Sequence, residues 1–452
     1  MTLSPCSSAL LTDLYELTML QAYWREGMNG VAVFELFIRR LPRGRNFLMA
    51  AGLAQVLDYL ENLAFSSEEL NWLSSCGLFA KDFVDYLAPM RFRGDVHALP
   101  EGTVFFADEP LLRITAPLPQ AQFIETRLLN IMNFSTAAAS KAARCVLAAG
   151  DRRLVEFGLR RAQGGEGGLW ASRAAYLAGF DATSNTLAAP LFGIPVSGTM
   201  AHSFIQAHDS EAEAFEIFAR ANPQSSTLLL DTYDVDAAAA QAAILGVRLG
   251  AEGLPLQGVR LDSGDMAAQA KRVRRELDVA GLESATIFAS GNLDEWAIRD
   301  LLSAGAPIGG FGVGTRLSTS ADAPYFDCAY KLQEYAGKPR RKRSEGKATW
   351  PGRKQVWRSL VDDWFAGDVV ALEGEPFPGA PLLVPVMREG RRLVQPSLEE
   401  SRRYARVQLE ALPRALRSLD PAPPYSVRLS EGLRALAAAL DEGRRPVSAA
   451  AS

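Results

Sequence analysis

The chain has 452 residues, more than one ordinary domain needs, and this length suits a large α/β domain with a smaller partner. Hydrophobic residues make up 48% and charged residues 22%, so the composition is that of a globular protein with a sizeable core. The net charge of −4 argues against a protein that binds nucleic acid or acidic membranes through its overall charge.

Four scattered cysteines form no C-x-x-C pair, which argues against a zinc knuckle and against a disulfide framework. The first twenty residues lack the basic start and apolar core of a signal peptide. No run of about 18 apolar residues occurs, so we expect no membrane-spanning helix. The sequence thus predicts a cytoplasmic protein with reduced thiols.

The N-terminal third mixes helices with strands. Residues 12–24 repeat apolar side chains at helical spacing, and residues 31–38 (VAVFELFI) predict a strand. Residues 94–117 predict short antiparallel strands separated by proline and glycine, and residues 120–149 predict helix. This mixture indicates an α+β segment.

From Arg153 onward, short apolar runs alternate with helical patterns. Strands that alternate with helices form parallel sheets, and about seven such units favour a closed or nearly closed α/β barrel, although an open sheet also fits. Glycine and polar residues follow each run, at the strand end where α/β folds hold their active sites. The runs are 153–158, 179–182, 194–199, 227–232, 258–263, 286–291 and 308–315.

After Pro324 the chain becomes a mixed region that opens with a basic stretch, 337–347. That stretch fits a solvated loop, a site for small polyanions or an RNA contact, although it has no interleaved aromatic residues. The predicted fold is an irregular TIM-like α/β barrel with a second α+β domain built from both terminal segments. We place the N-terminal segment at 1–135, the barrel at 136–325, the returning C-terminal segment at 326–440 and a disordered tail at 441–452.

Two carboxylates follow the run in GVRLDSGD. Asp262 and Asp265 could accept hydrogen bonds from vicinal hydroxyls or hold Mg²⁺. The alternative is a helix cap, because aspartate and serine before MAAQAKRV would cap that helix well.

Glycine-rich turns follow the last two runs, at 290–292 and 311–315. Backbone N–H groups that glycine exposes at helix N-termini bind phosphates, although each turn alone fits ordinary strand-to-helix chemistry. Neither turn is a Walker loop, because no G-K-[ST] follows.

Two further motifs contain residues whose role the sequence pattern does not decide. Arg160 and Arg161 in EFGLRRAQG suit carboxylate or phosphate recognition, with surface ion pairs as the alternative. His202 in SGTMAHS is expected four residues into a helix, and His208 is turned about 240° from it, which excludes an i,i+4 zinc pair. His202 could instead be a nucleophile toward a phosphoryl group, or a structural histidine.

These stretches together resemble the nicotinate phosphoribosyltransferase family, which has the type II phosphoribosyltransferase fold. The resemblance implies transfer of the phosphoribosyl group of 5-phosphoribosyl 1-pyrophosphate to nicotinate in NAD salvage, coupled to ATP hydrolysis. It also implies Mg²⁺ as cofactor and a homodimer with shared active sites. The matching stretches are LLTDLYELTM, FELFIRRLP, EFGLRRAQG, GFDATSN, SGTMAHSF, GVRLDSGD, FASGNLDE, GFGVGT and SEGKATWPGRKQVWR.

The resemblance assigns roles to individual residues. His202 matches the family's phosphorylated histidine, Asp262 the carboxylate that holds the ribose hydroxyls, and Arg160 and Arg260 two arginines near the substrate. His202, Asp262 and Arg260 are thus the predicted catalytic residues, and Asp265 is a second candidate for orienting the ribose. The aromatic pair around the pyridine corresponds to Tyr15, from the partner subunit, and Phe157. The 5-phosphate turns correspond to Gly291, Gly312, Gly314 and Thr315, and the ATP and pyrophosphate contacts to Arg40, Lys342, Lys347 and Arg353.

Ser184 in GFDATSN stands where nicotinamide-using relatives place an aspartate, and a hydroxyl there tolerates the nicotinate carboxylate. Arg343 departs from the family, which commonly has an apolar residue between the lysine and serine of this stretch. The alternatives are a quinolinate or nicotinamide phosphoribosyltransferase, a catalytically silent barrel that regulates or binds, and an RNA-binding protein that uses residues 337–347.

Overall fold

The computed structural model describes residues 8–442. Contacts within the chain divide it into two units. We call them the terminal unit, which combines the segments up to Ala137 and from Tyr325 onward, and the central unit, Ala138–Pro324. Helix α6 (Glu125–Ala149) passes from one unit into the other. None of the described helices is long and apolar enough to cross a membrane.

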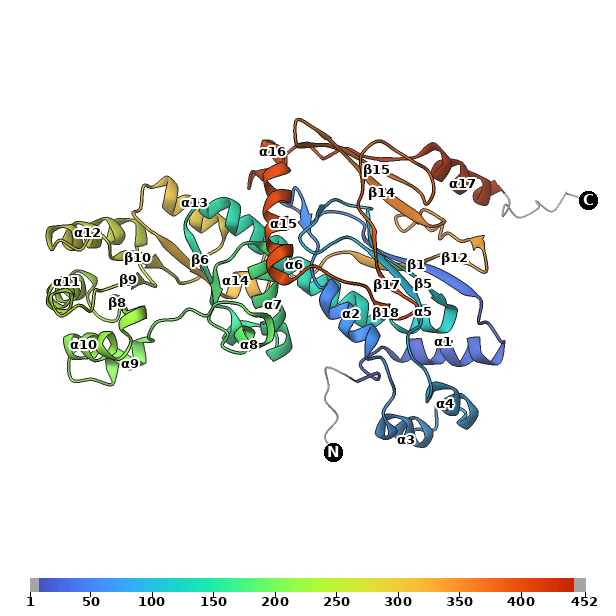
Figure 1. Ribbon diagram of the computed structural model, residues 1–452, viewed down its shortest axis with the longest axis horizontal. Helices are drawn as coiled ribbons and strands as arrows, with labels where there is room; N and C mark the ends of the chain where they lie inside the picture. Colours follow the sequence, from blue (N-terminus) through green and yellow to red (C-terminus); the bar gives the residue numbers. More distant parts are fainter. Residues whose placement is uncertain (1–7, 443–452) are drawn as a thin grey trace, which may run out of the picture. The chain divides into compact units, whose positions relative to one another are not determined.

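The terminal unit is built on an antiparallel sheet that joins both ends of the chain (Figure 1). Its strand β1 (Val31–Ile38) pairs with β5 (Pro110–Pro117) on one side and with β12 (Cys328–Tyr335) on the other. Seven of the eight β1 residues are buried, and the strand predicted at 31–38 is confirmed. The sheet order is β13-β12-β1-β5-β3-β17-β18, with β3 at Asp95–Ala98, β13 at Lys338–Pro339, β17 at Val384–Arg388 and β18 at Arg391–Arg392.

Two smaller sheets complete the terminal unit. β14 (Lys354–Val361) and β15 (Trp364–Leu372) form an antiparallel pair, and β15 also pairs in parallel with β19 (Val427–Leu429). The short strands β16 (Ala380–Pro381), β2 (Leu48–Met49) and β4 (Val104–Phe105) supply the remaining pairs. The antiparallel strands predicted within 94–117 are therefore confirmed as β3, β4 and β5.

The helices of the terminal unit begin where the sequence supplies caps. Ser66 accepts a hydrogen bond from the Glu69 amide while the Glu69 carboxylate accepts one from the Ser66 amide, and Ser397 and Glu400 repeat this capping box. The predicted helices are confirmed, with 120–149 divided at Ile124. The bounds are α1 (Leu14–Arg25), α2 (Leu53–Glu61), α3 (Ser67–Ser75), α4 (Lys81–Leu87), α5 (Leu118–Phe123), α15 (Leu398–Ala411), α16 (Arg414–Arg417) and α17 (Glu431–Glu442).

Glu16 on α1 is buried close to a second carboxylate. Its Oε2 accepts a hydrogen bond from Gln122 Nε2 at 3.0 Å, and the same amide donates to Glu125 Oε2 at 2.9 Å. Burial, reinforced by the charge of Glu125, raises the pKa of Glu16 to about 7. The terminal unit therefore contains a carboxyl group that titrates near neutral pH.

The substitution Glu16→Gln is expected to stabilise the chain above neutral pH. The folded-state pKa of Glu16, about 7, lies above its ordinary value of 4.5. The stability that the protonated form contributes is therefore complete below pH 4.5 and is lost as the pH rises through 7. A neutral amide still accepts from Gln122, so relative to the wild type the free energy of unfolding should be about 2 kcal/mol higher at pH 8 than at pH 4.5. Urea unfolding at both pH values measures the difference, and a pH-independent result would contradict the prediction.

The central unit is a parallel sheet whose strands alternate with helices (Figure 1). Every ladder in this sheet is parallel, which confirms the predicted α/β class. The strand order is β7-β6-β11-β10-β9-β8. The strands are β6 (Arg153–Glu156), β7 (Ala182–Thr183), β8 (Thr227–Leu229), β9 (Gly258–Leu261), β10 (Thr286–Ala289) and β11 (Gly310–Val313).

This strand order fits a barrel that is interrupted at one place. The first strand of the unit, β6, pairs with the last, β11, and such pairing of first with last is what closes a barrel. Within residues 8–442 no ladder joins β7 to β8, and the sheet continues past β7 only through an isolated bridge between Thr183 and Val196. The break lies between β7 and β8.

Aspartates begin three helices of the central unit. Asp234, Asp265 and Asp294 each accept a hydrogen bond from the amide three residues further along the chain. The α-helices are α7 (Gly165–Ala178), α8 (Ala188–Phe192), α9 (His202–Gln206), α10 (Glu211–Ala221), α11 (Val235–Ala251), α12 (Met266–Val279), α13 (Glu295–Ser303) and α14 (Thr315–Ser318), and 3₁₀ turns occur at Leu159–Arg161 and Pro223–Ser225.

Two local predictions for the central unit are wrong. The strand expected at 194–199 is reduced to the bridge at Val196, because Pro195 has no N–H to donate to a ladder. The helix expected to begin after Thr199 begins at His202, because Ala201 is extended. The disordered tail was predicted at 441–452. Its first two residues are the last two residues of α17, and residues 443–452 lie outside the described residues.

A cluster of buried charges ties α6 to α13 inside the central unit. The Glu295 side chain has no exposed surface, and its carboxylate contacts Lys141 Nζ at 2.5 Å and Arg144 Nε at 2.8 Å. Lys141 also contacts Asp322 at 2.7 Å. The ring of Trp296 lies 4.6 Å from Lys141 Nζ and 5.0 Å from Arg144 Cζ. We call this group the charge cluster.

Candidate active site

The central unit gathers most of the predicted site residues at the carboxyl ends of its strands. Phe157 follows β6, Ser184 follows β7, Asp262 follows β9 and Gly291 comes shortly after β10. Because all these strands are parallel, their carboxyl ends lie at the same edge of the sheet. This edge is the candidate active site.

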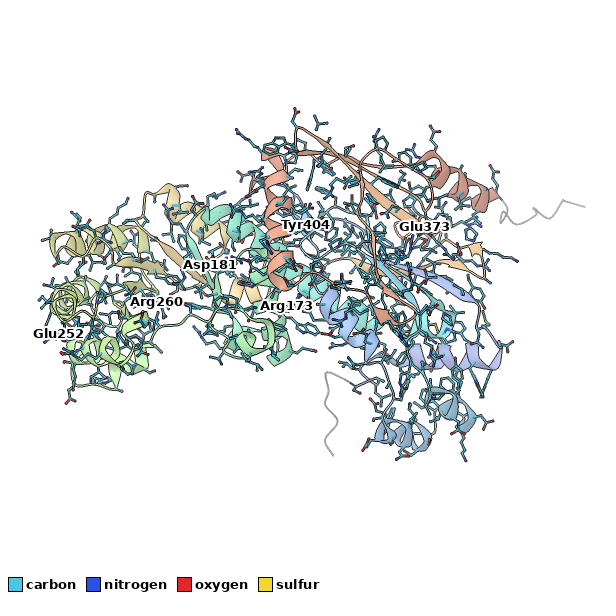
Figure 2. The ribbon with its side chains drawn as sticks, viewed as in Figure 1. Arg173, Asp181, Glu252, Arg260, Glu373 and Tyr404 are labelled. Atoms are coloured by element: carbon cyan, nitrogen blue, oxygen red, sulfur yellow. The ribbon has the colours of Figure 1, made fainter. Side chains whose placement is uncertain are left out.

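Arg260 is the most extensively bonded residue of this edge, and Figure 2 shows it on the β8–β10 side of the central unit. Its Nε donates to Ser290 Oγ at 2.9 Å, and one terminal nitrogen donates to Thr199 Oγ1 at 2.5 Å and to the Met200 carbonyl at 3.1 Å. The other terminal nitrogen contacts Asp262 Oδ1 at 3.3 Å. The guanidinium is therefore held in one orientation.

Asp262 belongs to the same network. Ser290 Oγ donates to its Oδ1, the atom that also faces Arg260. The Asp262 side chain keeps 31% of its surface exposed, whereas Arg260 keeps 11%. The carboxylate can therefore reach a ligand while the arginine behind it stays fixed.

Asp231, after β8, is a residue that the sequence analysis did not single out. Its Oδ2 accepts hydrogen bonds from the Asp262 amide at 3.1 Å and from Ser263 Oγ at 2.6 Å. Its Oδ1 is buried and has no hydrogen-bond partner among the described residues. The signal was an aspartate directly after the apolar run TLLLD, the same pattern that pointed to Asp262.

These carboxylates offer only a partial set of metal ligands. Residues 8–442 contain no group of three or more His, Cys, Asp or Glu side chains that could hold a metal ion. The Asp262 carboxylate is partly exposed, whereas the unpartnered Oδ1 of Asp231 is buried. Mg²⁺ commonly binds through one or two carboxylates together with substrate phosphates, so the residues fit a metal that arrives with a phosphorylated substrate.

His202 is linked to this cluster through the loop after β8. Its Nδ1 lies 3.1 Å from Thr232 Oγ1, and Thr232 directly follows Asp231. A hydrogen bond at Nδ1 orients the imidazole ring. The structure thus brings His202, Arg260 and Asp262, the three predicted catalytic residues, into one connected network.

The glycines of the last strands make room for neighbouring groups. A Cβ on Gly291, which has φ +92°, would lie 1.9 Å from the Asp262 carbonyl oxygen. A Cβ on Gly312 would lie 2.5 Å from the Phe157 ring, and one on Gly314 2.9 Å from the Phe157 carbonyl oxygen. Gly312 lies within β11 and not in the predicted turn, and Thr315 opens α14 after Gly314.

Phe157 and Ser184 line a cavity of about 610 Å³ together with Thr199. Arg153, Thr227 and Thr286, the first residues of β6, β8 and β10, also line it, so the cavity extends from the carboxyl-end edge toward the amino ends of the strands. The Arg260 Cζ lies 6.0 Å from the centre of the Phe157 ring, a cation–π distance, and the Phe288 ring lies 5.9 Å from it. A cavity of this size accommodates a small aromatic molecule.

The two remaining predicted residues of the central unit have simpler surroundings. Arg160 lies exposed in the turn after β6 and makes no ion pair with any described residue, so the surface ion pairs considered as the alternative are absent there. Asp265 caps α12, which supports the alternative that the sequence offered for it. It also lines a shallow cavity of about 430 Å³ together with Gly264, Gly291 and Asn292.

Five predicted residues belong to the terminal unit. Tyr15 is half exposed on α1, and burial together with Glu125 raises its pKa. The exposed Arg40 contacts Asp327, and Arg353 contacts Glu334 at 3.0 Å. Lys342 and Lys347 lie exposed between β13 and β14, whereas Arg343 between them bonds the Asp441 carbonyl. These five lie in the terminal unit, while the connected network around Arg260 lies in the central unit.

Models of one family match most of the chain. The nicotinate phosphoribosyltransferase N-terminal domain matches residues 10–133, the family's main model matches 152–344, and its C-terminal domain matches 375–437. A nicotinate phosphoribosyltransferase of Mycobacterium tuberculosis is 52% identical over 385 residues, which cover 85% of this chain and 83% of the relative. The enzyme of that name from Bacillus subtilis is 41% identical over 82% of this chain and 77% of its own length.

Solved structures show the same likeness. The crystal structure of human nicotinic acid phosphoribosyltransferase superimposes with a TM-score of 0.85 at 33% identity, covering 95% of this chain and 99% of the human one. A nicotinate-nucleotide pyrophosphorylase from Pyrococcus furiosus has a TM-score of 0.75 at 26% identity, with coverages of 91% and 97%. The chain therefore belongs to the nicotinate phosphoribosyltransferase family of enzymes.

Proposed function

We propose that this chain transfers the phosphoribosyl group of 5-phosphoribosyl 1-pyrophosphate to nicotinate, giving nicotinate mononucleotide and pyrophosphate in NAD biosynthesis. The observation that carries the proposal is the Arg260–Asp262 network at the strand ends, in a chain 52% identical to an enzyme of that name. The cavity lined by Phe157 and Ser184, which reaches from the strand ends into the space between the strands, supports an aromatic acceptor.

In the proposed reaction the bond from the anomeric carbon to pyrophosphate breaks as a bond to the pyridine nitrogen forms. That nitrogen carries no proton, so the chain needs no general base. Asp262, held by Ser290 Oγ, would orient the ribose hydroxyls, and Phe157 would place the ring. Mg²⁺, when bound, would neutralise the phosphate oxygens, and Asp262, whose side chain is partly exposed, is the carboxylate that would reach it.

Product analysis tests the substrate. Mass spectrometry after incubation with 5-phosphoribosyl 1-pyrophosphate and nicotinate, nicotinamide or quinolinate should show a mononucleotide with nicotinate far in excess of the other two. Ser184 supports this preference, because its hydroxyl has no charge that would repel a carboxylate. A product formed chiefly from nicotinamide or quinolinate would overturn the assignment.

We also propose that ATP hydrolysis is coupled to the transfer through phosphorylation of His202. The hydrogen bond of its Nδ1 to Thr232 and its link to Asp262 through the loop after β8 support this role. The proposal includes a homodimer in which Tyr15 completes the partner's site. It also places four basic residues in contact with ATP and pyrophosphate: Arg40, Lys342, Lys347 and Arg353. A cytoplasmic location remains a prediction.

The substitution His202→Ala is expected to leave phosphoribosyl transfer and to abolish its stimulation by ATP, because the acceptor of the phosphoryl group is gone. Initial rates with and without ATP measure the stimulation. His208→Ala is the matched control, since His208 bonds the Phe204 carbonyl at 2.7 Å and belongs to no predicted site. Full ATP stimulation in the His202 variant would exclude the phosphohistidine.

A further inference from the structure

A buried carboxylate lies directly behind the cavity that Phe157 and Ser184 line. Glu156 is the last residue of β6 and is 1% exposed. Successive side chains of a strand point to opposite faces, so Glu156 and Phe157 point away from each other. None of the residues that line the cavity is Glu156, so it has no direct access to a ligand there.

The Glu156 carboxylate joins three separate elements. One oxygen, Oε2, accepts hydrogen bonds from Thr183 Oγ1 at 2.6 Å and from Ser172 Oγ at 3.0 Å. The other, Oε1, accepts from the Gly158 amide. Glu156 therefore connects β7, α7 and the turn that follows Phe157.

A neighbouring donor orients the Thr183 hydroxyl toward Glu156, whereas the Ser172 hydroxyl has a second acceptor, the Gly168 carbonyl at 2.9 Å. The Asn185 amide donates to Thr183 Oγ1 at 3.0 Å, so the single proton of that hydroxyl is free to point to Glu156. The Asn185 side chain donates to Ser172 Oγ at 3.3 Å. The carboxylate is thus the final acceptor of a chain of donors that begins at Asn185.

Ser184 is held on both sides by this network. It lies between Thr183 and Asn185, and its own amide donates to the Glu156 carbonyl at 2.8 Å. Two hydrogen bonds flank Phe157: the Gly158 amide donates to the Glu156 carboxylate, and the Phe157 amide donates to the Val313 carbonyl at 2.8 Å. Both residues that face the cavity thus depend on contacts of Glu156 or its immediate neighbours.

We propose that Glu156 is a positioning residue for the pyridine substrate, which sets Phe157 and Ser184 through Thr183, Ser172 and Gly158 without touching the ligand. The inference rests on the proposed function, in which Phe157 and Ser184 contact the pyridine. It predicts that changes to this network act mainly on the pyridine, because Arg260 and Asp262 make no bond to it, and the 5-phosphate residues Gly312 and Gly314 meet it only through Phe157.

A glutamine can replace this carboxylate only if the hydroxyls around it turn. With its oxygen toward the Gly158 N–H, its NH₂ group faces the Thr183 and Ser172 hydroxyls, whose protons must then point to Ser172 Oγ at 3.2 Å and to the Gly168 carbonyl at 2.9 Å. The charge-assisted hydrogen bonds to the carboxylate are lost in this rearrangement, so the segment around Ser184 would shift. Burial raises the pKa of Glu156, which agrees with a carboxyl group held inside the protein.

The test compares Glu156→Gln with Thr183→Val, which removes one donor at similar shape, and with Thr183→Ser, which restores the hydroxyl. KM for nicotinate should rise about tenfold in Glu156→Gln and severalfold in Thr183→Val, while KM for 5-phosphoribosyl 1-pyrophosphate stays within about twofold. Thr183→Ser should behave like the wild type. Glu295→Gln is the matched control, because Glu295 is a buried carboxylate of the charge cluster in the same unit. It should lower the melting temperature and leave both KM values unchanged.

The inference is overturned if both KM values rise together, or if Thr183→Val and Glu156→Gln lose stability with an unchanged nicotinate KM. Should Glu156→Gln fail to fold, Thr183→Val and Thr183→Ser decide alone. Failure of the proposed function is visible separately in the wild type, as a lack of nicotinate conversion. In that case the same KM ratios, measured with the pyridine that the wild type does accept, decide the role of Glu156.

Discussion

The substitution Arg260→Ala is expected to lower kcat/KM by about a hundredfold to a thousandfold, the range seen when one preorganised donor to a reacting group is removed. The reason is the fixed orientation of the guanidinium by Ser290, Thr199 and Asp262. Its loss removes a positive charge from the site and also frees the Asp262 carboxylate to rotate. Steady-state kinetics with nicotinate and 5-phosphoribosyl 1-pyrophosphate measure the effect.

Two comparisons separate charge from geometry at this position. Arg260→Lys keeps the positive charge but cannot donate to Ser290, Thr199 and Asp262 together, so it should recover only part of the lost activity. Circular dichroism should show both variants folded, because the arginine bonds loop ends and not the core. Activity of Arg260→Ala within tenfold of the wild type would show that the network is not part of the active site.

The second large effect is expected on stability, from Glu295→Gln in the charge cluster. Neutralising this carboxylate leaves Lys141 and Arg144 buried with much less compensation, and breaking such a buried pair commonly costs about 3 to 5 kcal/mol. A glutamine retains one acceptor, so we expect the free energy of unfolding to fall by about 3 kcal/mol. Urea unfolding followed by fluorescence or circular dichroism measures it.

Asp322→Asn is the matched comparison for this prediction. Asp322 contacts the same Lys141, but its side chain keeps 25% of its surface exposed. Solvent compensates for a partly exposed partner, so this variant should lose about 1 kcal/mol or less. Equal losses in the two variants would mean that burial does not determine the strength of the cluster.

Local sequence patterns were enough to predict the helices and strands whose apolar residues form continuous runs or repeat at helical spacing. The run VAVFELFI became β1 at the predicted bounds, and the runs after Arg153 became parallel strands. The segment 194–199 failed, because its composition resembles a strand while Pro195 removes a ladder donor. The predicted start of the helix after Thr199 was wrong, because Ala201 is extended and its conformation depends on contacts that the local sequence pattern does not contain.

The candidate site was predictable where its chemistry is local to a strand end. Arg260 and Asp262 lie two residues apart, so their association follows from one strand. The link from His202 to Thr232 joins residues 30 positions apart, and the tie from Asp231 to Ser263 joins residues 32 positions apart. Such contacts require the strand order, which explains why Asp231 was missed although it follows an apolar run. The packing of Gly312 against the Phe157 ring likewise depends on the neighbouring strands β11 and β6.

The pairing of β1 with β12 has a consequence for how the chain reaches its native state. Arg39 and Asp327, which bond at the end of that pairing, are 288 residues apart, whereas the central unit is continuous in sequence. During synthesis β1 leaves the ribosome long before β12 is made, so its apolar edge stays unpaired until then. We therefore expect the central unit to acquire its structure first, with closure of the terminal sheet as the slow step.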